Sequence, residues 1–385
     1  MTFDNLLIII FCISLIIYCA YLIIFIVGFF LSRKHFSSDT PKVSVIIAAR
    51  NEEDCIERCI NSICQQKYSN ENFEVIVVND HSEDATQSIV QSLLKNYNNL
   101  KLINITDRPQ DYAPKKYAIN EALNVATGEI ILTTDADITV KPSWIESIVS
   151  FFEQEVGLVV GYSSVRETQI KKFFQKFEAL DFLMLLTATK GSIRIGLPIS
   201  CTGQNLSFRK KAFDEVGGFG EKNKTQSADD VLLLHLMRKS KKWQIAFAED
   251  SNSFVETDAT KSLIEFLKQR IRWAAMGVGQ FSKSLNLTIM SVATSIANIG
   301  LLLLVGYSLI SAGLFQFVIL ALIVKLLVDF LIAAIGSYYF EKFSLLWFFP
   351  FLFIFYMPYI LIISIFSLFG NFRWKKRVYK MTKIK

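Results

Sequence analysis

Hydrophobic residues are concentrated at the two ends of the 385-residue chain, while the middle alternates between short apolar runs and polar segments. Residues 6–31 contain no charged side chain, and at about 1.5 Å per residue this segment is long enough to cross a hydrocarbon core of about 30 Å. Three further apolar segments follow at 287–311, 314–340 and 345–369. The pattern predicts one amino-terminal membrane helix and a carboxyl-terminal membrane domain of about three segments.

Charges beside these segments predict their orientation. Arg33, Lys34 and His35 follow the first segment, so the positive-inside rule places the next domain in the cytoplasm and the amino terminus outside. The tail, residues 371–385, carries seven Lys or Arg and no acid. Three full crossings would deliver this tail to the outside, against the rule. Either one segment does not cross or the tail is an exception, and we favour a segment that does not cross.

Two of the carboxyl-terminal segments carry unusual residues. Lys325 and Asp329 are four residues apart inside 314–340, so they share one helix face and can pair. A functional intramembrane pair and a pair that merely neutralises itself both remain open. Pro350 and Pro358 predict a kinked or broken helix in the last segment.

Composition excludes several classes of protein. A hydrophobic content of 52% and a mean hydropathy of +0.36 exclude a disordered chain and a wholly soluble one. The net charge of +6 falls to −1 without the seven basic residues of the tail, so no nucleic-acid-binding surface is expected. The six scattered Cys predict free thiols in a reducing compartment. The three His are far apart in the sequence, which argues against a His-based zinc site or a Ser-His-Asp relay.

The middle of the chain, residues 41–277, has the pattern of an α/β domain. Apolar runs rich in β-branched residues at 43–49, 74–80, 101–105 and 129–137 alternate with segments of helical periodicity. This alternation predicts a doubly wound, mostly parallel sheet. Ligands of such sheets bind beyond the carboxyl ends of the strands.

Acidic residues occur where these strands end. Asp80 closes the second strand, and Asp135 and Asp137 close the fourth. Two carboxylates separated by one residue can hold Mg²⁺ or Mn²⁺ together with diphosphate oxygens. The alternative is an ordinary polar turn in which Asp serves as a cap.

Six motifs follow one another along the chain: VSVIIAARNEE, VIVVNDHSEDAT, KKYAINEALNVATGEIILTTDAD, GQNLSFRKKAF, SADDVLLLHLM and QRIRW. In order and spacing they resemble those of the family 2 glycosyltransferases. The resemblance covers about residues 42–273 and implies an inverting enzyme with a GT-A fold, a Rossmann-like domain. The flanking apolar segments resemble the membrane-integrated branch that includes cellulose, hyaluronan and chitin-type synthases and ceramide glucosyltransferases.

The resemblance implies a nucleotide-sugar site at the strand ends. It matches Asp80 to the acid that reads a uracil ring, which implies a UDP-sugar donor, whereas Asn79 replaces a second acid that is usual in the family. It matches Lys115 to a lysine that helps to bind the nucleotide, and the adjacent Lys116 is an alternative candidate. Both lysines could equally be ordinary solvated residues. The donor-binding candidates are Ala48, Arg50, Glu52, Asp80, Lys115 and Asp135, with Asp135 and Asp137 as metal ligands.

The resemblance also assigns catalytic roles. Asp230 matches the base that activates the acceptor, with Asp229 before it and Ala228 where Thr is common; a helix cap is the alternative. In QRIRW, Gln269, Arg272 and Trp273 share one helix face, where Arg272 could stabilise the leaving diphosphate and Trp273 could stack on the acceptor. The alternative is an amphipathic helix at the membrane surface.

Two further segments are assigned less specifically. Residues 170–191 combine Phe and Lys in a pattern that fits an interfacial helix or a buried core helix. Gly203, Gln204 and Asn205 match an acceptor-side loop of the family.

Taken together, the sequence predicts a membrane-bound inverting glycosyltransferase that moves a sugar from a nucleotide sugar, with UDP expected, to a lipid or lipid-linked acceptor at the bilayer. The predicted organisation is residues 1–35, a membrane helix; 41–277, the cytoplasmic transferase domain; 286–370, the membrane domain; and 371–385, the basic tail. A processive polysaccharide synthase is the alternative. An alternative from a different class is a transport or scaffold protein with a degenerate nucleotide-sugar domain. The Lys325 and Asp329 pair would have a function in such a protein.

Overall fold

The computed structural model describes residues 3–31, 37–109, 112–220, 229–281, 284–310, 312–369, 372–374 and 377–379. Arg33, Lys34, His35, Ala228 and most of the basic tail therefore lie outside the described residues. The chain divides into two compact units. The sheet unit comprises Arg33–Gln169, Ser200–Asp258 and Asn371–Lys385, and the helical unit comprises Met1–Ser32, Ile170–Ile199 and Ala259–Gly370.

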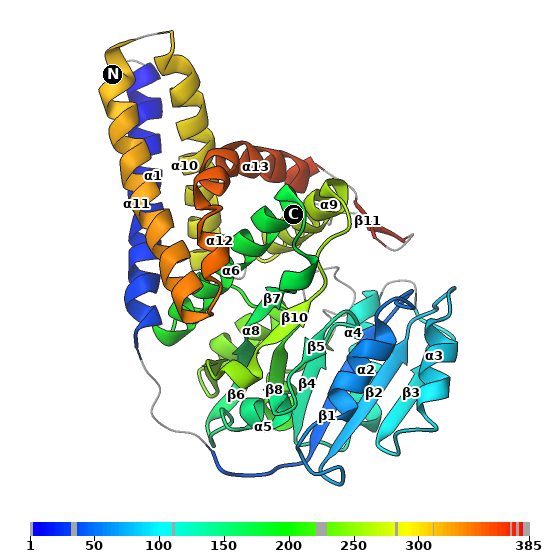
Figure 1. Ribbon diagram of the computed structural model, residues 1–385. Coiled ribbons are helices and arrows are strands. Elements are labelled where there is room, and N and C mark those ends of the chain that lie inside the picture. Colours follow the sequence, from blue (N-terminus) through cyan, green and yellow to red (C-terminus); the bar gives the residue numbers. More distant parts are fainter. Residues whose placement is uncertain are drawn as a thin grey trace. The chain divides into compact units, whose positions relative to one another are not determined.

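The sheet unit is built on a seven-stranded sheet with the order β3-β2-β1-β4-β8-β6-β9 (Figure 1). Neighbouring strands are parallel except at β8, which runs antiparallel to both β4 and β6. The predicted mostly parallel α/β fold is therefore confirmed. The strands are β1 (Val43–Ala49), β2 (Phe73–Asn79), β3 (Leu100–Asn104), β4 (Ile130–Thr134), β6 (Val156–Gly161), β8 (Leu206–Arg209) and β9 (Gln244–Ala248).

A smaller sheet and short helices complete this unit. The smaller sheet has the order β5-β10-β7. Its strands are β5 (Thr139–Val140), β7 (Ser163–Val165) and β10 (Val255–Thr257), and β11 (Phe372–Trp374) pairs with β12 (Arg377–Tyr379). The α-helices are α2 (Ile56–Cys64), α3 (Thr86–Leu93), α4 (Pro114–Val125), α5 (Trp144–Val149), α7 (Lys210–Glu215) and α8 (Asp229–Ser240), and the 3-10 turns are η1 (Glu167–Gln169) and η3 (Ser251–Ser253).

The apolar runs become the buried layer of the sheet unit. All seven residues of β2 are buried, as a strand covered on both faces requires. Helix α2 buries Ile56, Cys59, Ile60 and Ile63 against this core, which is the face that the periodicity predicts. The order of strands reverses between β1 and β4, so the topological switch point lies at their carboxyl ends.

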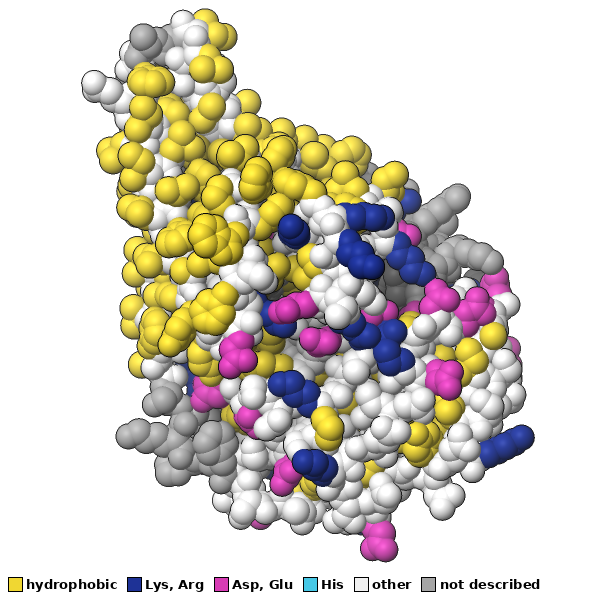
Figure 2. Space-filling view, viewed as in Figure 1, with side chains coloured by type: hydrophobic (Ala, Val, Ile, Leu, Met, Phe, Trp, Pro, Cys, Tyr) yellow, Lys and Arg dark blue, Asp and Glu magenta, His cyan; other side chains and the backbone are white. Residues whose placement is uncertain are grey.

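The helical unit contains the four apolar helices, each long enough to cross a membrane. Figure 2 shows their hydrophobic side chains covering the surface of this unit. The unit also contains residues 170–199 and 259–277, which the sequence pattern groups with the 41–277 domain. The helices are α1 (Phe3–Phe29), α6 (Phe173–Arg194), α9 (Leu263–Val278), α10 (Leu285–Ser308), α11 (Phe315–Tyr339), α12 (Phe343–Leu346) and α13 (Phe349–Phe369), with the 3-10 turn η5 (Ala312–Leu314).

Helix α6 contains most of the segment predicted to be either interfacial or buried. Phe177 and Leu180 are buried, whereas Phe173 is half exposed and packs against Phe348 and Phe351 of the α12–α13 region. The buried side chains make α6 a core helix of the helical unit along most of its length.

The Lys325 and Asp329 pair lies inside the helical unit. The two side chains form a buried ion pair, and Tyr18 of α1 donates a hydrogen bond to Asp329 Oδ1 at 2.7 Å. Lys325 Nζ also lies 5.0 Å from the ring centroid of Phe353 in α13. Because the pair is compensated and connects three helices, the contacts favour the self-neutralising interpretation.

Candidate functional site

The carboxyl ends of β1 and β2 form the first part of the site. Asn51 and His81 have φ angles of 52° and 57°, a left-handed conformation that turns the chain sharply after each strand. Arg50 donates from an Nη atom to the backbone oxygen of Asp80 at 2.9 Å, and His81 Nδ1 lies 2.9 Å from Asp80 Oδ1. Asp80 is thereby fixed beside Arg50, with its carboxylate nearly buried.

The other predicted donor residues of this edge have different environments. Ala48, in β1, is half-buried. The backbone N–H of Glu52 donates to Thr86 Oγ1 at 2.7 Å, and the Glu52 carboxylate accepts from Cys55 Sγ. Asn79 instead donates to Asn104 Oδ1 at 2.9 Å, so its amide joins β2 to β3.

Asp135 and Asp137 follow β4 directly. Asp135 Oδ1 accepts a hydrogen bond from Lys115 Nζ at 2.7 Å, and Asp137 Oδ2 accepts one from Thr257 Oγ1 at 3.0 Å. Burial, followed by the charges of Asp135 and Glu52, raises the pKa of Asp137 to about 7. Negative charge is therefore crowded at this strand end, and a bound cation would relieve it.

Hard oxygen donors of this kind fit Mg²⁺ or Mn²⁺. Within the described residues, no three His, Cys, Asp or Glu side chains are grouped so as to hold a metal ion by themselves. Two carboxylates would therefore need oxygen ligands from a diphosphate or from water to complete the coordination.

Asp229 and Asp230 are the first residues of α8. Asp230 Oδ2 accepts from the backbone N–H of Gly203 at 2.8 Å, and Asp230 Oδ1 accepts from the backbone N–H of Val231 at 2.7 Å. Burial, followed by the neighbouring charge of Asp229, raises the pKa of Asp230 to about 6. The carboxylate is thus held in a fixed orientation and is a stronger base than an exposed Asp.

Lys115 connects these acids. Its Nζ atom lies 2.7 Å from Asp135 Oδ1 and 4.0 Å from Asp229 Oδ2. Burial alone would lower the pKa of Lys115, but the carboxylates of Asp135 and Asp229 outweigh it and raise the pKa. The structure therefore brings together Lys115, Asp135, Asp229 and Asp230, which come from three distant parts of the chain.

Gly203 is the residue of the predicted acceptor-side loop that faces these acids. A Cβ atom at Gly203 would lie 3.0 Å from Lys115 Nζ and 3.5 Å from Asp230 Oδ2. Asn205 is buried, and its amide donates to the backbone oxygens of Tyr162 and Ser253. Gln204 donates to Thr257 Oγ1 at 3.2 Å, and its buried Oε1 has no hydrogen-bond partner among the described residues.

The remaining predicted residues, Gln269, Arg272 and Trp273, lie half-buried on α9 in the helical unit. Their convergence with the acids of the sheet unit stays a prediction. Gln269 Oε1 accepts from an Nη atom of Arg270 at 3.4 Å. The Trp273 ring has its centroid 5.8 Å from that of Phe182 in α6.

Arg270, inside the QRIRW motif, is a residue that the motif-based assignment misses. Its Nε atom donates to Asp181 Oδ2 at 3.0 Å, and its guanidinium carbon lies 4.3 Å from the Trp273 ring centroid. Tyr359 of α13 also donates to Asp181 Oδ2, at 3.5 Å. The signal was available in the sequence, because Arg270 shares a helix face with Trp273 three residues later and Phe266 four residues earlier.

The central part of the chain is similar to a known protein family. Residues 44–217 match the family model described as glycosyl transferase family 2. The chain carries a family 2 glycosyltransferase domain. The predicted resemblance is therefore confirmed for the region that contains Asp80, Asp135 and Asp137.

The similarity to individual proteins covers more of the chain than this domain. Beta-monoglucosyldiacylglycerol synthase from Trichormus variabilis is 28% identical over 250 residues, which is 65% of this chain and 52% of that protein. The corresponding synthase from a Synechocystis strain is 25% identical over 241 residues, 63% of this chain and 49% of that protein. The chain thus spans about half the length of these relatives.

One solved structure shares the fold of this chain. The mannosyltransferase PcManGT from Pyrobaculum calidifontis, in complex with GDP-Man and Mn²⁺, superposes with a TM-score of 0.61 and 19% identity, covering 93% of this chain and 99% of that one. At this identity the likeness establishes a common fold.

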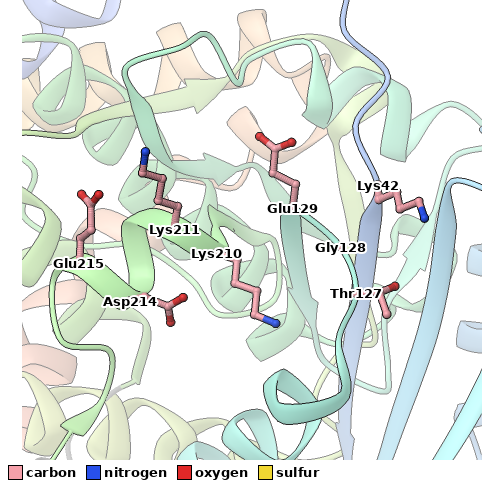
Figure 3. Close-up of a pocket in the computed structure, with 8 residues that line it drawn as sticks. All are labelled: Lys42, Thr127, Gly128, Glu129, Lys210, Lys211, Asp214 and Glu215. Atoms are coloured by element: carbon pink, nitrogen blue, oxygen red, sulfur yellow. The ribbon is translucent and has the colours of Figure 1, made fainter.

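The glycosyltransferase domain also has a cavity at its opposite edge. It has a volume of about 530 Å³ (Figure 3). Lys42 and Glu129, which line it, directly precede β1 and β4, so the cavity adjoins the amino ends of these strands. Ligands of doubly wound sheets bind at the carboxyl ends, so this cavity is not the candidate active site. Its other lining residues are Thr127, Gly128, Lys210, Lys211, Asp214 and Glu215.

Proposed function

We propose that this membrane protein transfers a sugar from a nucleoside diphosphate sugar to a lipid or lipid-linked acceptor in a single inverting displacement. The observation that carries the proposal is the grouping of Lys115, Asp135, Asp229 and Asp230 at the carboxyl edge of a family 2 glycosyltransferase domain. A decayed domain has no physical reason to keep carboxylates crowded at raised pKa values, because such crowding destabilises the fold.

Donor binding is assigned to the β1 and β2 edge. Asp80, held by Arg50 and His81, would accept from an N–H group of the base, and the resemblance points to uracil. Ala48 and Glu52 lie two residues before and after Arg50 in the chain, and Lys115 would face the phosphates. Gln204 Oε1, buried and without a partner among the described residues, is available to accept from a sugar hydroxyl.

Asp135 and Asp137 would hold Mg²⁺ or Mn²⁺, as their donor atoms and crowded charge fit. The cation, when bound, supplies neutralisation of the charge on the departing diphosphate. Arg272 is assigned to the same leaving group, and Gln269 and Trp273 to the acceptor.

Asp230 is assigned as the base. Two backbone N–H groups hold its carboxylate, and a pKa of about 6 leaves it ionised at neutral pH. Asp230 takes the proton of the acceptor hydroxyl while that oxygen forms its bond to the anomeric carbon. The bond from that carbon to the diphosphate oxygen breaks from the opposite face, and the configuration inverts.

The acceptor is proposed to be a diacylglycerol-type lipid. The relatives that carry this description act on such a lipid by name, and the apolar helices would keep the domain at the bilayer. Arg33, Lys34 and His35 support a cytoplasmic location of the sheet unit under the positive-inside rule.

The test is a donor screen with product sizing. The purified full chain is incubated with labelled UDP-sugars or GDP-sugars, Mn²⁺ and diacylglycerol in lipid nanodiscs. One added sugar per lipid supports the proposal, and a ladder of products supports the processive alternative. If the protein neither transfers nor hydrolyses any donor, this result would contradict both proposals and favour a transport or scaffold protein.

A further inference from the structure

The path of α13 through the helical unit bears on which apolar helices cross the membrane. Helices α10 and α11 are joined by a short connection, and we call this end of the bundle the far end. At the near end, the rings of Phe29 in α1 and Tyr339 in α11 lie 4.9 Å apart between centroids. The near end is the end at which α1 leads into the sheet unit and α10 begins.

Contacts with α11 fix the level at which α13 starts. The ring of Phe349 lies 5.3 Å from that of Phe330, and Lys325 Nζ lies 5.3 Å from the ring of Tyr356. Lys325 comes about ten residues after α11 begins, which is roughly 15 Å along the helix from the far end. The first third of α13 therefore rises beside α11 but stops well below the far end.

Contacts with α10 show that the rest of α13 rises no further. Ser364 Oγ lies 3.1 Å from Ser295 Oγ, and such short side chains require the two helices to meet at that level. Ser295 precedes the end of α10 at Ser308 by about thirteen residues, roughly 20 Å. From Tyr356 to Ser364 the chain advances along α13 without approaching the far end.

The turn has a local cause. Pro358 lies inside α13, where it removes a backbone hydrogen bond and kinks the helix. After it, Tyr359 stacks on Phe266 of α9 at 5.8 Å between centroids and donates to Asp181 of α6. Figure 1 shows the last part of α13 running across the direction of α1, α10 and α11.

We propose that α13 enters the bilayer from the near end and returns without crossing it, although it is long and apolar enough to cross. Within the described chain, α1, α10 and α11 are then the crossing helices. The carboxyl terminus lies on the same side of the membrane as the sheet unit. This inference does not depend on the proposed function.

The surface of α13 fits the acyl chains of one leaflet. Its exposed side chains are large and apolar on both sides of Pro358, and of these Phe351 and Phe355 also pack against Phe173 of α6. A lipid surface is the partner that covers such a face in a membrane protein. These side chains are Phe351, Ile354, Phe355, Ile362, Ile365 and Phe366.

The distribution of charge agrees with three crossings. The connection at the far end, residues 309–314, carries no charge, whereas Arg33, Lys34 and the seven basic residues of the tail would all lie on one side. The positive-inside rule is then satisfied by both termini of the membrane domain, and the conflict that three carboxyl-terminal crossings create disappears.

Protease protection of tagged full-length protein tests the inference. One tag follows Lys385, and a matched tag follows Gly313 in the far-end connection, where the structure leaves open space. In sealed vesicles whose sheet unit is digested by added protease, the Lys385 tag should be lost almost completely and the Gly313 tag retained. Protection of the Lys385 tag together with loss of the Gly313 tag, or equal behaviour of both, would overturn the proposal.

A second measurement covers variants that fold poorly with a tag. Nitroxide labels replace Ile354, Ile362 and Phe366 on α13, and Leu320, Leu327 and Leu331 on the crossing helix α11. Along α11 the depth in the bilayer should change steadily, by roughly 16 Å over the set. On α13 the three labels should differ by less than half of that, and a steady change equal to that of α11 would contradict the proposal.

Discussion

Buried and crowded charges occur in both units, but they are arranged in opposite ways. In the helical unit two buried carboxylates have a cation within hydrogen-bonding distance: Asp329 has Lys325, and Asp181 has Arg270 at 3.0 Å. In the sheet unit Asp230 is held by backbone N–H groups and Asp137 by a hydroxyl. The first arrangement pairs each of these acids with a cation, whereas in the second a neighbouring acid adds to burial in raising the pKa of Asp137 and of Asp230.

This difference separates structure from chemistry. A buried ion pair tolerates substitution poorly, because removal of either partner leaves the other charge uncompensated in a medium of low dielectric constant. A cluster of acids is stabilised when it binds a cation or a proton, because the repulsion between the carboxylates falls. A transferase site requires this property. The same residue types therefore form compensated pairs in the helical unit and crowded acids in the sheet unit.

The largest effect is expected at Asp230. Replacement by Asn removes the proposed base, so the transfer rate should fall by about 10² to 10⁴-fold. Donor binding should change less than about twofold, because the amide keeps the shape of the side chain. Initial rates and nucleotide titrations measure both quantities, with Asp214→Asn beside the remote cavity as the matched control. Near-normal turnover of Asp230→Asn would show that another group is the base.

A stability measurement on the same variant sharpens the comparison. Because the folded protein raises the pKa of Asp230, its ionisation weakens folding as the pH rises from about 4 through about 6. Asp230→Asn should therefore be as stable as the parent protein, or more stable, at pH 7. A clear loss of stability would place Asp230 among the structural charges.

The Arg270 and Asp181 pair should show the opposite behaviour. Arg270→Met leaves Asp181 buried without its cation and should reduce the free energy of unfolding by about 3–5 kcal/mol. The double variant Arg270→Met with Asp181→Leu should recover most of this loss, since no charge is stranded. Denaturant unfolding in mild detergent measures the three proteins. A double variant as unstable as the single one would mean that packing, not charge, dominates.

The smallest effect is expected in the pH profile. The proposed base must be ionised to accept a proton, so kcat/KM should fall about tenfold per pH unit below a midpoint near 6. Asp229→Asn removes a charge that raises the pKa of Asp230, and should move the midpoint to lower pH. Lys115→Met removes a charge that lowers this pKa, and should move it to higher pH. Shifts in one common direction would contradict the arrangement.

Much of the fold could be predicted because it follows from local patterns. The first four strands of the sheet begin and end close to the apolar runs that predict them, and the four long apolar helices form where charge is absent. The division of the chain was not predictable in this way. Residues 170–199 and 259–277 join the helical unit through contacts such as Arg270 with Asp181, which are distant in sequence.

The candidate site was predictable in part. Motif order identified Asp135 and Asp230, and the structure shows Lys115 and Gly203 between them. The backbone N–H of Gly203 left no signal in the sequence, because any residue has that group and only the fold directs it at a carboxylate. The path of α13 likewise depends on packing against α9 and α10, which hydropathy alone does not encode.

The acids of the sheet unit are proposed to divide into a pair that holds a cation with a diphosphate and a base that does not. Electron paramagnetic resonance of Mn²⁺, titrated into protein with and without UDP, distinguishes these two roles. We expect tight Mn²⁺ binding that requires the nucleotide, at least tenfold weaker binding in Asp135→Asn and Asp137→Asn, and unchanged binding in Asp230→Asn. Mn²⁺ binding that is the same in all four proteins would contradict the account.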